Sequence, residues 1–127
     1  MIQVYSGMLS NYVKGINAEA RVVNILIDYG YDILGRRVKT KYGEIDILAY
    51  KNNTVVAVEV KQRKTLNIAR ECLTNRQMHR ISKALQLIIY ERNLLFENYR
   101  IDVVLLDRIG NYEYIINAFS FETDTDI

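Results

Sequence analysis

The segment from residue 43 to residue 61 constrains the fold more than any other part of this chain. It contains two runs rich in β-branched residues, Glu44–Tyr50 and Val55–Lys61, joined by a polar stretch that includes Asn52 and Asn53. Asparagine tolerates the positive φ angles of a tight turn between two strands. We therefore expect an antiparallel β-hairpin here.

The hairpin places an unusual set of charges on one face of the sheet. If its loop holds two or four residues, Asp46 faces Glu59 directly and Glu44 faces Lys61. The opposite face then carries only apolar side chains, which we expect in the core: Ile45, Ile47, Ala49, Val56, Val58 and Val60. The expected register thus follows from the burial of the apolar face.

Asp46 and Glu59 form a pair of facing carboxylates, whose repulsion costs a few tenths to about 1 kcal/mol. A magnesium ion would compensate for this repulsion, because it binds carboxylate oxygens and keeps several water ligands. Lys61 follows Glu59 by two residues and would lie close to such an ion, where it could hold an attacking water or neutralise a phosphorane-like transition state. An ordinary ladder of surface salt bridges is the alternative.

A helix is expected before the hairpin. Apolar residues recur at helical spacing, at positions 13, 16, 20, 23 and 27, and Gly30 suits the C-terminal cap. Positions 14, 17, 21, 24 and 28 form the polar side. Glu19 falls within the apolar arc, so we expect its carboxylate to point toward the body of the protein. Such groups are rarely buried without partners, so Glu19, Asp46, Glu59 and Lys61 indicate a site.

The remaining segments complete an α/β domain. Residues 31–42 are expected to form an irregular strand, and the capping-box pattern Thr74-x-x-Gln77 opens a second helix that runs to about Arg92. Two further strands are expected at residues 100–107 and 112–119. The sequence thus predicts a mixed sheet of about five strands flanked by helices, in the order α-β-β-β-α-β-β. Without a linker or repeat, residues 1–127 are expected to be one domain.

Composition and charge exclude several classes of protein. A single cysteine and a single histidine exclude an internal disulfide and a structural zinc site, and they favour a reducing, cytoplasmic setting. No apolar run approaches the ~20 residues needed to cross a bilayer, so we expect no membrane partner. Between residues 36 and 83, twelve Lys and Arg stand against four acids. This excess suggests contact with a polyanion such as nucleic acid, with solvated surface charge as the alternative.

Basic residues around the hairpin are the candidates for contact with phosphate. They are Arg36, Arg37, Lys39, Lys41, Arg63 and Lys64. Arg63 and Lys64 follow the second hairpin strand and could equally be solvated charges at a strand end. Glu44 could assist a metal or simply pair with Lys61 across the hairpin.

The element order, with Asp46 before a turn and Glu59-x-Lys61 after it, resembles the PD-(D/E)XK fold of restriction and junction-resolving endonucleases. Five stretches resemble the bacterial YraN-like family, whose members are similar to archaeal Holliday junction resolvases: Gly15-x-x-Ala18-Glu19, Gly30-Tyr31-x-Ile-Leu34, Gly43-Glu-Ile-Asp-Ile-Leu48, Val58-Glu-Val-Lys-Gln-Arg63 and Arg100-Ile-Asp-Val-Val104. The resemblance covers roughly Asn11 to Phe119. Two departures are Gln77, where a lysine is expected, and Ile45, where the signature has proline.

The resemblance implies a restriction-endonuclease-like fold with Glu19, Asp46, Glu59 and Lys61 in the active site. Asp46 and Glu59 would bind Mg²⁺ or Mn²⁺, Glu19 would complete or orient the site, and Lys61 would position the water that attacks a DNA phosphodiester. The substrate would be DNA rather than RNA, branched or damaged, and cutting two strands would require a homodimer. The alternatives are a non-catalytic nucleic-acid-binding module or a structural partner in a repair or RNA-processing assembly.

Overall fold

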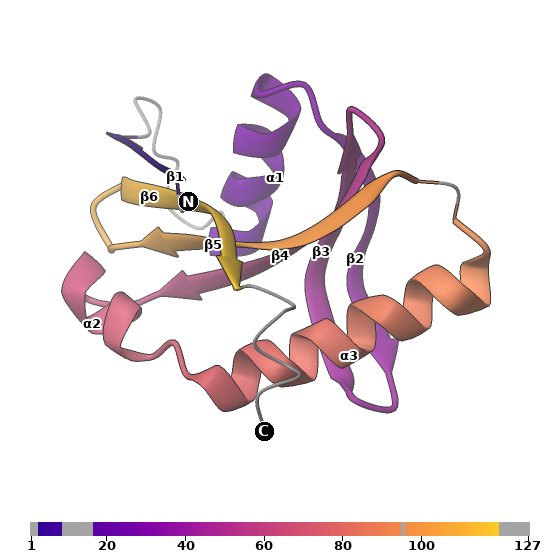
Figure 1. Cartoon of the computed structure of the whole chain (residues 1–127). Coiled ribbons are helices and arrows are strands. Elements are labelled where there is room, and N and C mark those ends of the chain that lie inside the picture. Colours follow the sequence, from indigo (N-terminus) through magenta and orange to yellow (C-terminus); the bar gives the residue numbers. More distant parts are fainter. Residues whose placement is uncertain (1–2, 9–16, 95, 120–127) are drawn as a thin grey trace.

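The computed structural model describes residues 3–8, 17–94 and 96–119 (Figure 1). These residues form a mixed sheet of six strands and three helices. The elements follow one another as β1 (Gln3–Met8), α1 (Ala18–Asp28), β2 (Asp32–Thr40), β3 (Gly43–Lys51), β4 (Thr54–Gln62), α2 (Leu66–Glu71), α3 (Asn75–Arg92), β5 (Asn98–Leu106) and β6 (Asn111–Phe119).

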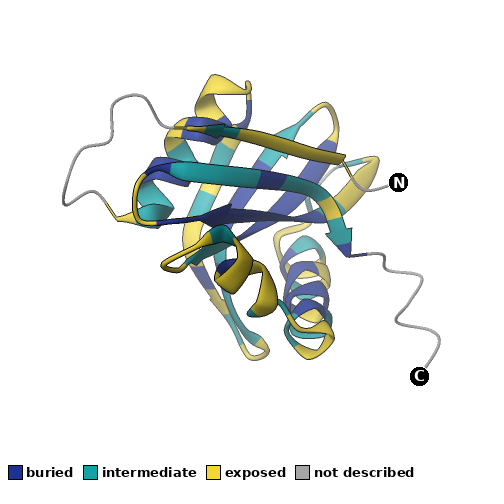
Figure 2. Cartoon of the chain, turned by 90° about the vertical axis from the view of Figure 1, so that its left-hand side faces the viewer, coloured by how far each residue is buried: buried dark blue, intermediate teal, exposed yellow. Residues whose placement is uncertain are grey.

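The α/β class is confirmed, but the predicted strand number and element order were wrong in two places. β1 adds a sixth strand, which pairs with β6 at the edge of the sheet and is mostly exposed (Figure 2). An exposed edge strand needs no apolar alternation, so the sequence pattern did not reveal it. α2 is a six-residue helix capped by Thr65, whose Oγ1 accepts a hydrogen bond from the Ile68 amide. This helix is too short for a periodic signal.

The sheet has the strand order β1-β6-β5-β4-β3-β2, and only the β4–β5 pair is parallel within it. Parallel neighbours need a crossover connection, which α2 and α3 supply. α1 therefore lies on one face of the sheet and α3 on the other (Figure 1). Within the described part of the chain, no helix is long and apolar enough to span a bilayer.

Each face of the sheet has an apolar core of its own. On the α1 side, Val22, Ile25 and Leu26 pack against a cluster of sheet residues: Ile47, Ala49, Val56, Val58, Val104, Leu106 and Tyr114. On the α3 side, the helix residues Met78, Ile81, Leu85 and Ile88 join a second cluster: Val38, Ile45, Leu48, Val55, Ala57, Ile101, Val103, Leu105 and Phe119. The predicted apolar face is confirmed for Ile47, Ala49, Val56 and Val58, with Val60 packed against them, whereas Ile45 lies in the cluster on the α3 side. The other face of the hairpin is apolar as well, because the crossover helix covers it.

α1 begins after Asn17, whose Oδ1 accepts a hydrogen bond from the Ala20 amide at 2.8 Å. Positions 13 and 16 of the predicted apolar stripe lie outside the described residues. The helix buries Val22, Ile25 and Leu26, together with Arg21, whereas Ile27 is 54% exposed. The predicted stripe and the buried residues Val22, Ile25 and Leu26 both have helical spacing, and only the position of the sheet decides which residues are buried. The predicted polar placement of Arg21 was therefore wrong.

The hairpin of β3 and β4 is confirmed. Asn52 and Asn53 have φ angles of 50° and 58°, as a turn of two left-handed residues requires. The paired residues run from Lys51–Thr54 to Ile47–Val58 in the predicted register. Beyond Ile47 the Asp46 Oδ2 atom accepts a hydrogen bond from the Val60 amide at 2.8 Å. A side chain thus replaces a main-chain acceptor where the two strands approach the predicted site.

A buried carboxylate ties β5 to β6, and its arginine partner reaches Tyr31, which directly precedes β2. Asp102 is fully buried and accepts hydrogen bonds from Tyr114 Oη at 2.7 Å, from the Asn117 amide at 2.9 Å and from Arg100 Nε at 2.9 Å. Arg100 also donates to the hydroxyl of Tyr31. The Arg100-Ile-Asp102 stretch therefore has a structural role in the sheet.

We expect Asp102→Ala to lower the free energy of unfolding by about 3–5 kcal/mol, because it leaves Arg100 half-buried without its carboxylate partner. Tyr114→Phe leaves the Arg100–Asp102 pair intact and removes only the hydroxyl that donates to Asp102, so it should cost only about 1–3 kcal/mol. Urea denaturation measures both, with the exposed Asp32→Ala as the control. A loss for Asp102→Ala no larger than that of the control would contradict a structural role.

Candidate active site

The predicted site residues gather where β3 begins and β4 ends. Asp46 lies in the first half of β3, and Glu59 and Lys61 lie in the last four residues of β4. Glu19 comes from the first turn of α1. The structure thus brings three segments together at one end of the two central hairpin strands, although they are far apart in the sequence.

Glu59 is a buried acid at the edge of the core, with an exposed fraction of only 6%. Strand alternation places it on the α3 side, with Val55 and Ala57. Burial, together with the hydrogen bond and the charge of Asp46, raises the pKa of Glu59 to about 8, against the opposing charges of Lys61 and Arg80. Glu59 therefore holds a proton at neutral pH when no cation is bound.

Asp46 connects Glu59 to a pocket on the α1 side of the sheet. Besides its hydrogen bond from Val60, its side chain lines a pocket of about 330 Å³ together with Glu19, Arg37 and Arg63. Asp46 thus touches the buried acid on one side and an open, charged pocket on the other. The pocket therefore opens the Asp46 end of the acid pair to solvent.

Glu19 lies in the same pocket, where two arginines bind it. Its side chain is 14% exposed, in line with the predicted inward direction, and its two oxygens lie 3.3 Å from Arg36 Nε and 3.4 Å from Arg37 Nε. Successive strand side chains normally point to opposite faces. Arg37 has a φ of 49°, a left-handed backbone that departs from the strand and lets both neighbours reach one carboxylate.

Asp46 and Glu59 provide a donor set of two carboxylates in contact. Hard oxygen donors suit Mg²⁺ and Mn²⁺, and a divalent cation could replace the proton on Glu59. Among the residues that the structure describes, no group of three or more His, Cys, Asp or Glu side chains is close enough to hold a metal ion. Glu19 would therefore join such an ion only after releasing its arginines.

Lys61 is half-buried and lies two residues beyond Glu59 on the same side of β4, where its charge acts on Glu59. The sequence left Glu44 either as an aid to a metal or as the partner of Lys61, but the β3–β4 pairing ends at Ile47–Val58, and Glu44 lies opposite Lys39 on β2. Lys61 is thus positioned beside the acid pair rather than in a ladder with Glu44.

The predicted phosphate-binding residues fall into separate groups. Arg36 and Arg37 bind Glu19, as described, and Arg63 lines the same pocket. The Lys41 Nζ atom lies 5.2 Å from the centre of the Tyr42 ring. Lys39 and Lys64 are exposed at other points of the surface. Only Arg36, Arg37 and Arg63 are therefore brought next to the acids.

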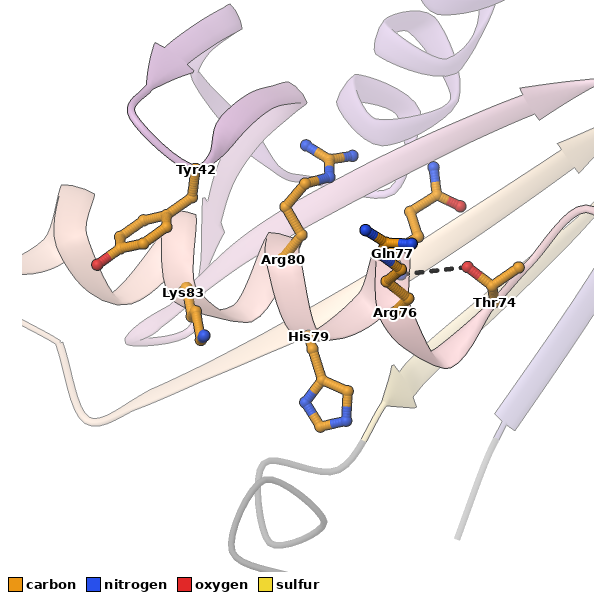
Figure 3. A pocket seen from close by; sticks show the side chains of 7 residues that line it. All are labelled: Tyr42, Thr74, Arg76, Gln77, His79, Arg80 and Lys83. Atoms are coloured by element: carbon orange, nitrogen blue, oxygen red, sulfur yellow. Dashed lines mark hydrogen bonds between the residues drawn. The ribbon is translucent and has the colours of Figure 1, made fainter. Parts of the chain in front are cut away.

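A second basic group, on α3, was missed as a site by the sequence analysis. Arg76, Arg80 and Lys83 line a groove of about 600 Å³ with Tyr42 (Figure 3). Their spacing of four and three residues places them on one helix face, a signal that the sequence does contain. Gly43 has a φ of 123°, and a Cβ atom there would lie 2.0 Å from Arg80 Nη1. Glycine thus leaves the space in which Arg80 approaches the site.

The raised pKa of Glu59 predicts a pH dependence of stability. Between the ordinary value of 4.5 and about 8 the folded state binds the extra proton, so this stabilisation is complete below pH 4.5 and is lost as the pH rises through 8. We expect the free energy of unfolding of the wild type, relative to Glu59→Gln, to fall over this range with a slope approaching about 1.4 kcal/mol per pH unit. Urea denaturation in EDTA measures this slope, and parallel pH profiles of the wild type and Glu59→Gln would contradict the raised pKa of Glu59.

Comparisons with known proteins agree on one family. The sequence model of the Uncharacterised protein family UPF0102 matches residues 18–106. A UPF0102 protein of Bradyrhizobium sp. (strain BTAi1) is 40% identical over 111 residues, which cover 86% of this chain and 81% of the relative. One from Sulfurihydrogenibium sp. (strain YO3AOP1) is 40% identical over 112 residues, covering 86% of this chain and 96% of the relative. The matched region contains Glu19, Asp46, Glu59 and Lys61, and the chain belongs to the UPF0102 family.

Proposed function

We propose that this chain is a metal-dependent nuclease of the PD-(D/E)XK type, related to the Holliday junction resolvases. The observation that carries the proposal is the buried Glu59 carboxyl in contact with Asp46, between the cations Lys61 and Arg80. A fold without a use for this pair would gain stability by replacing it with apolar residues. In a site that binds a divalent cation and a phosphodiester, both acids and both neighbouring cations have a role.

Asp46 and Glu59 would hold Mg²⁺ or Mn²⁺, which would supply Lewis-acid activation of water and of the phosphodiester. Lys61, on the same side of β4 as Glu59, positions the attacking water and neutralises charge on the phosphate in the transition state. Arg37 and Arg63 line the pocket that Asp46 reaches and bind the phosphate there. Glu19 orients Arg36 and Arg37 and can complete the site when they move to the substrate.

The proposed substrate is nucleic acid, DNA rather than RNA, at a branch or a damaged position. The excess of positive charge between residues 36 and 83 supports a polyanionic substrate. Resolution of a branch needs two cuts, so we extend the proposal to a homodimer that acts in the cytoplasm.

A non-catalytic nucleic-acid-binding module is the second candidate. Two arginines bind Glu19, so this acid, placed in the active site by the resemblance, has other partners. A binding module would keep the arginines and the basic surface without using the acid pair. Cleavage assays with Mg²⁺ and Mn²⁺ on single-stranded, duplex, flap and four-way junction DNA distinguish the two, because only the nuclease cuts.

Excess Mg²⁺ should stabilise the wild type by mass action, by about 2.7 kcal/mol at a hundredfold excess over the dissociation constant. The double variant Asp46→Asn, Glu59→Gln should lose this response, because no carboxylate pair remains. Thermal unfolding with and without Mg²⁺ measures the shift for each protein. The double variant Asp32→Asn, Glu97→Gln removes two exposed carboxylates elsewhere and should respond like the wild type. An equal response in all three would remove Asp46 and Glu59 from the metal site.

Lys61→Ala should reduce single-turnover cleavage by about 10²–10³-fold, the usual effect of losing one group that stabilises the transition state. Binding measured with Ca²⁺ should change little, because one phosphate contact alters the salt dependence by only about one unit of slope. Arg108→Ala, at an exposed position outside the candidate contacts with phosphate, is the control for the loss of one positive charge. Equal losses of cleavage and affinity in Lys61→Ala would make Lys61 a binding residue only.

A further inference from the structure

The groove on α3 is lined by charges of one sign. Arg76, Arg80 and Lys83 line it from the helix and Tyr42 from the β2–β3 turn, and none of its lining residues is acidic (Figure 3). The groove measures about 600 Å³ and lies on the opposite face of the sheet from the pocket that contains Glu19. It is therefore a second basic surface, separate from the arginines beside Glu19.

The cations of the groove do little for the helix that carries them. α3 packs on the sheet through Met78, Ile81 and Leu85, whereas Arg76 and Lys83 are exposed. Arg76 lies in the first turn, which contains no acid and where the helix dipole disfavours a positive charge by about 0.3–1 kcal/mol. Arg76 is thus placed at a cost that an anionic ligand would offset.

Arg80 joins this groove to the acid pair. Its guanidinium packs against the backbone of Gly43, and its charge acts on Glu59. Figure 3 shows the Arg80 side chain in the middle of the groove, between Arg76 on one side and Lys83 and Tyr42 on the other. A chain of phosphates in the groove would therefore lead to Asp46 and Glu59.

Tyr42 adds an aromatic ring at the end of the groove near Lys83 (Figure 3). The residue is 37% exposed and belongs to the turn between β2 and β3. Bases stack on such rings with little regard to sequence, and cationic grooves with aromatic rings are typical of proteins that bind single strands. A base inside a duplex has both faces covered by its neighbours, so it cannot stack on Tyr42.

We propose that the α3 groove binds a single-stranded segment of nucleic acid next to the acid pair. Tyr42 stacks on a base, Arg76 and Lys83 bind phosphates, and Arg80 binds the phosphate nearest to Asp46 and Glu59. The choice of nucleic acid as the ligand rests on the proposed function. The inference narrows the substrate class to DNA with an unpaired strand, such as a flap, a gap or an open junction.

Binding without cleavage tests this inference. Fluorescence anisotropy in EDTA compares a labelled oligo-dT with a duplex of equal length, using the full chain. Tyr42→Leu should weaken binding of the single strand by about 5- to 100-fold and leave duplex binding within about twofold. Tyr90→Leu is the matched control, because Tyr90 is an exposed tyrosine on α3, at 85% exposure, and lies outside the groove. Equal effects of the two variants, or no binding of oligo-dT by the wild type, would overturn the inference.

Salt dependence provides a second, independent measurement on exposed residues. The double variant Arg76→Gln, Lys83→Gln should reduce the slope of log affinity against log salt for oligo-dT by about 1.4, since each phosphate in a single strand contributes about 0.7. Arg92→Gln, Arg108→Gln removes two exposed charges outside the groove and should leave the slope nearly unchanged. Equal slopes in the two double variants would overturn the groove as the binding site.

The outcome is separable from that of the nuclease proposal. If Tyr42→Leu and the Arg76, Lys83 variant weaken single-strand binding but the wild type cuts nothing with Mg²⁺ or Mn²⁺, the groove is supported and the nuclease is not. If the wild type cuts duplex DNA and the groove variants behave like their controls, the nuclease is supported and the groove is overturned.

Discussion

The parallel pairing of β4 with β5 is the constraint on which the rest of the structure depends. It requires the crossover through α2 and α3, which places a helix on the second face of the sheet and buries β4 from both sides. Burial is complete over Thr54–Glu59 and relaxes over the last three residues of the strand. Glu59 therefore lies at the last fully buried position, where an acid is costly but still within reach of solvent through Asp46 and its pocket.

Several contacts around Glu59 lower the cost of burying this acid. Asp46 is held by the Val60 amide, and Lys61 and Arg80 oppose the charge that the two acids would share. Gly43 makes room for Arg80, and the pair Arg36 and Arg37 neutralises Glu19 on the other side of the sheet. Basic surfaces on both faces thus meet at one acid pair, an arrangement that suits a polyanion crossing the end of the sheet.

The sequence predicted correctly the features that depend on residues close together in the chain. The hairpin turn at Asn52 and Asn53, the register from Ile47–Val58 to Lys51–Thr54 and the Thr74 cap of α3 all follow from neighbouring residues. β1 was missed because an edge strand can be exposed on both faces, and α2 because six residues carry no period. The predicted apolar stripe of α1 was correct at Val23, which packs against the core, and wrong at Ile27, since only the position of the sheet selects which residues of the helix are buried.

For the candidate site, the sequence by itself determined the hairpin register up to Ile47–Val58 and the place of Lys61 two residues after Glu59, because residue alternation and the two-residue turn leave one register for the hairpin. Tertiary structure alone decided that Glu59 is buried beside Arg80 and that Glu19 is bound by two arginines. These contacts join residues separated by about 20 positions along the chain, and their distances depend on how helices pack on a sheet. No periodicity within one segment contains that information.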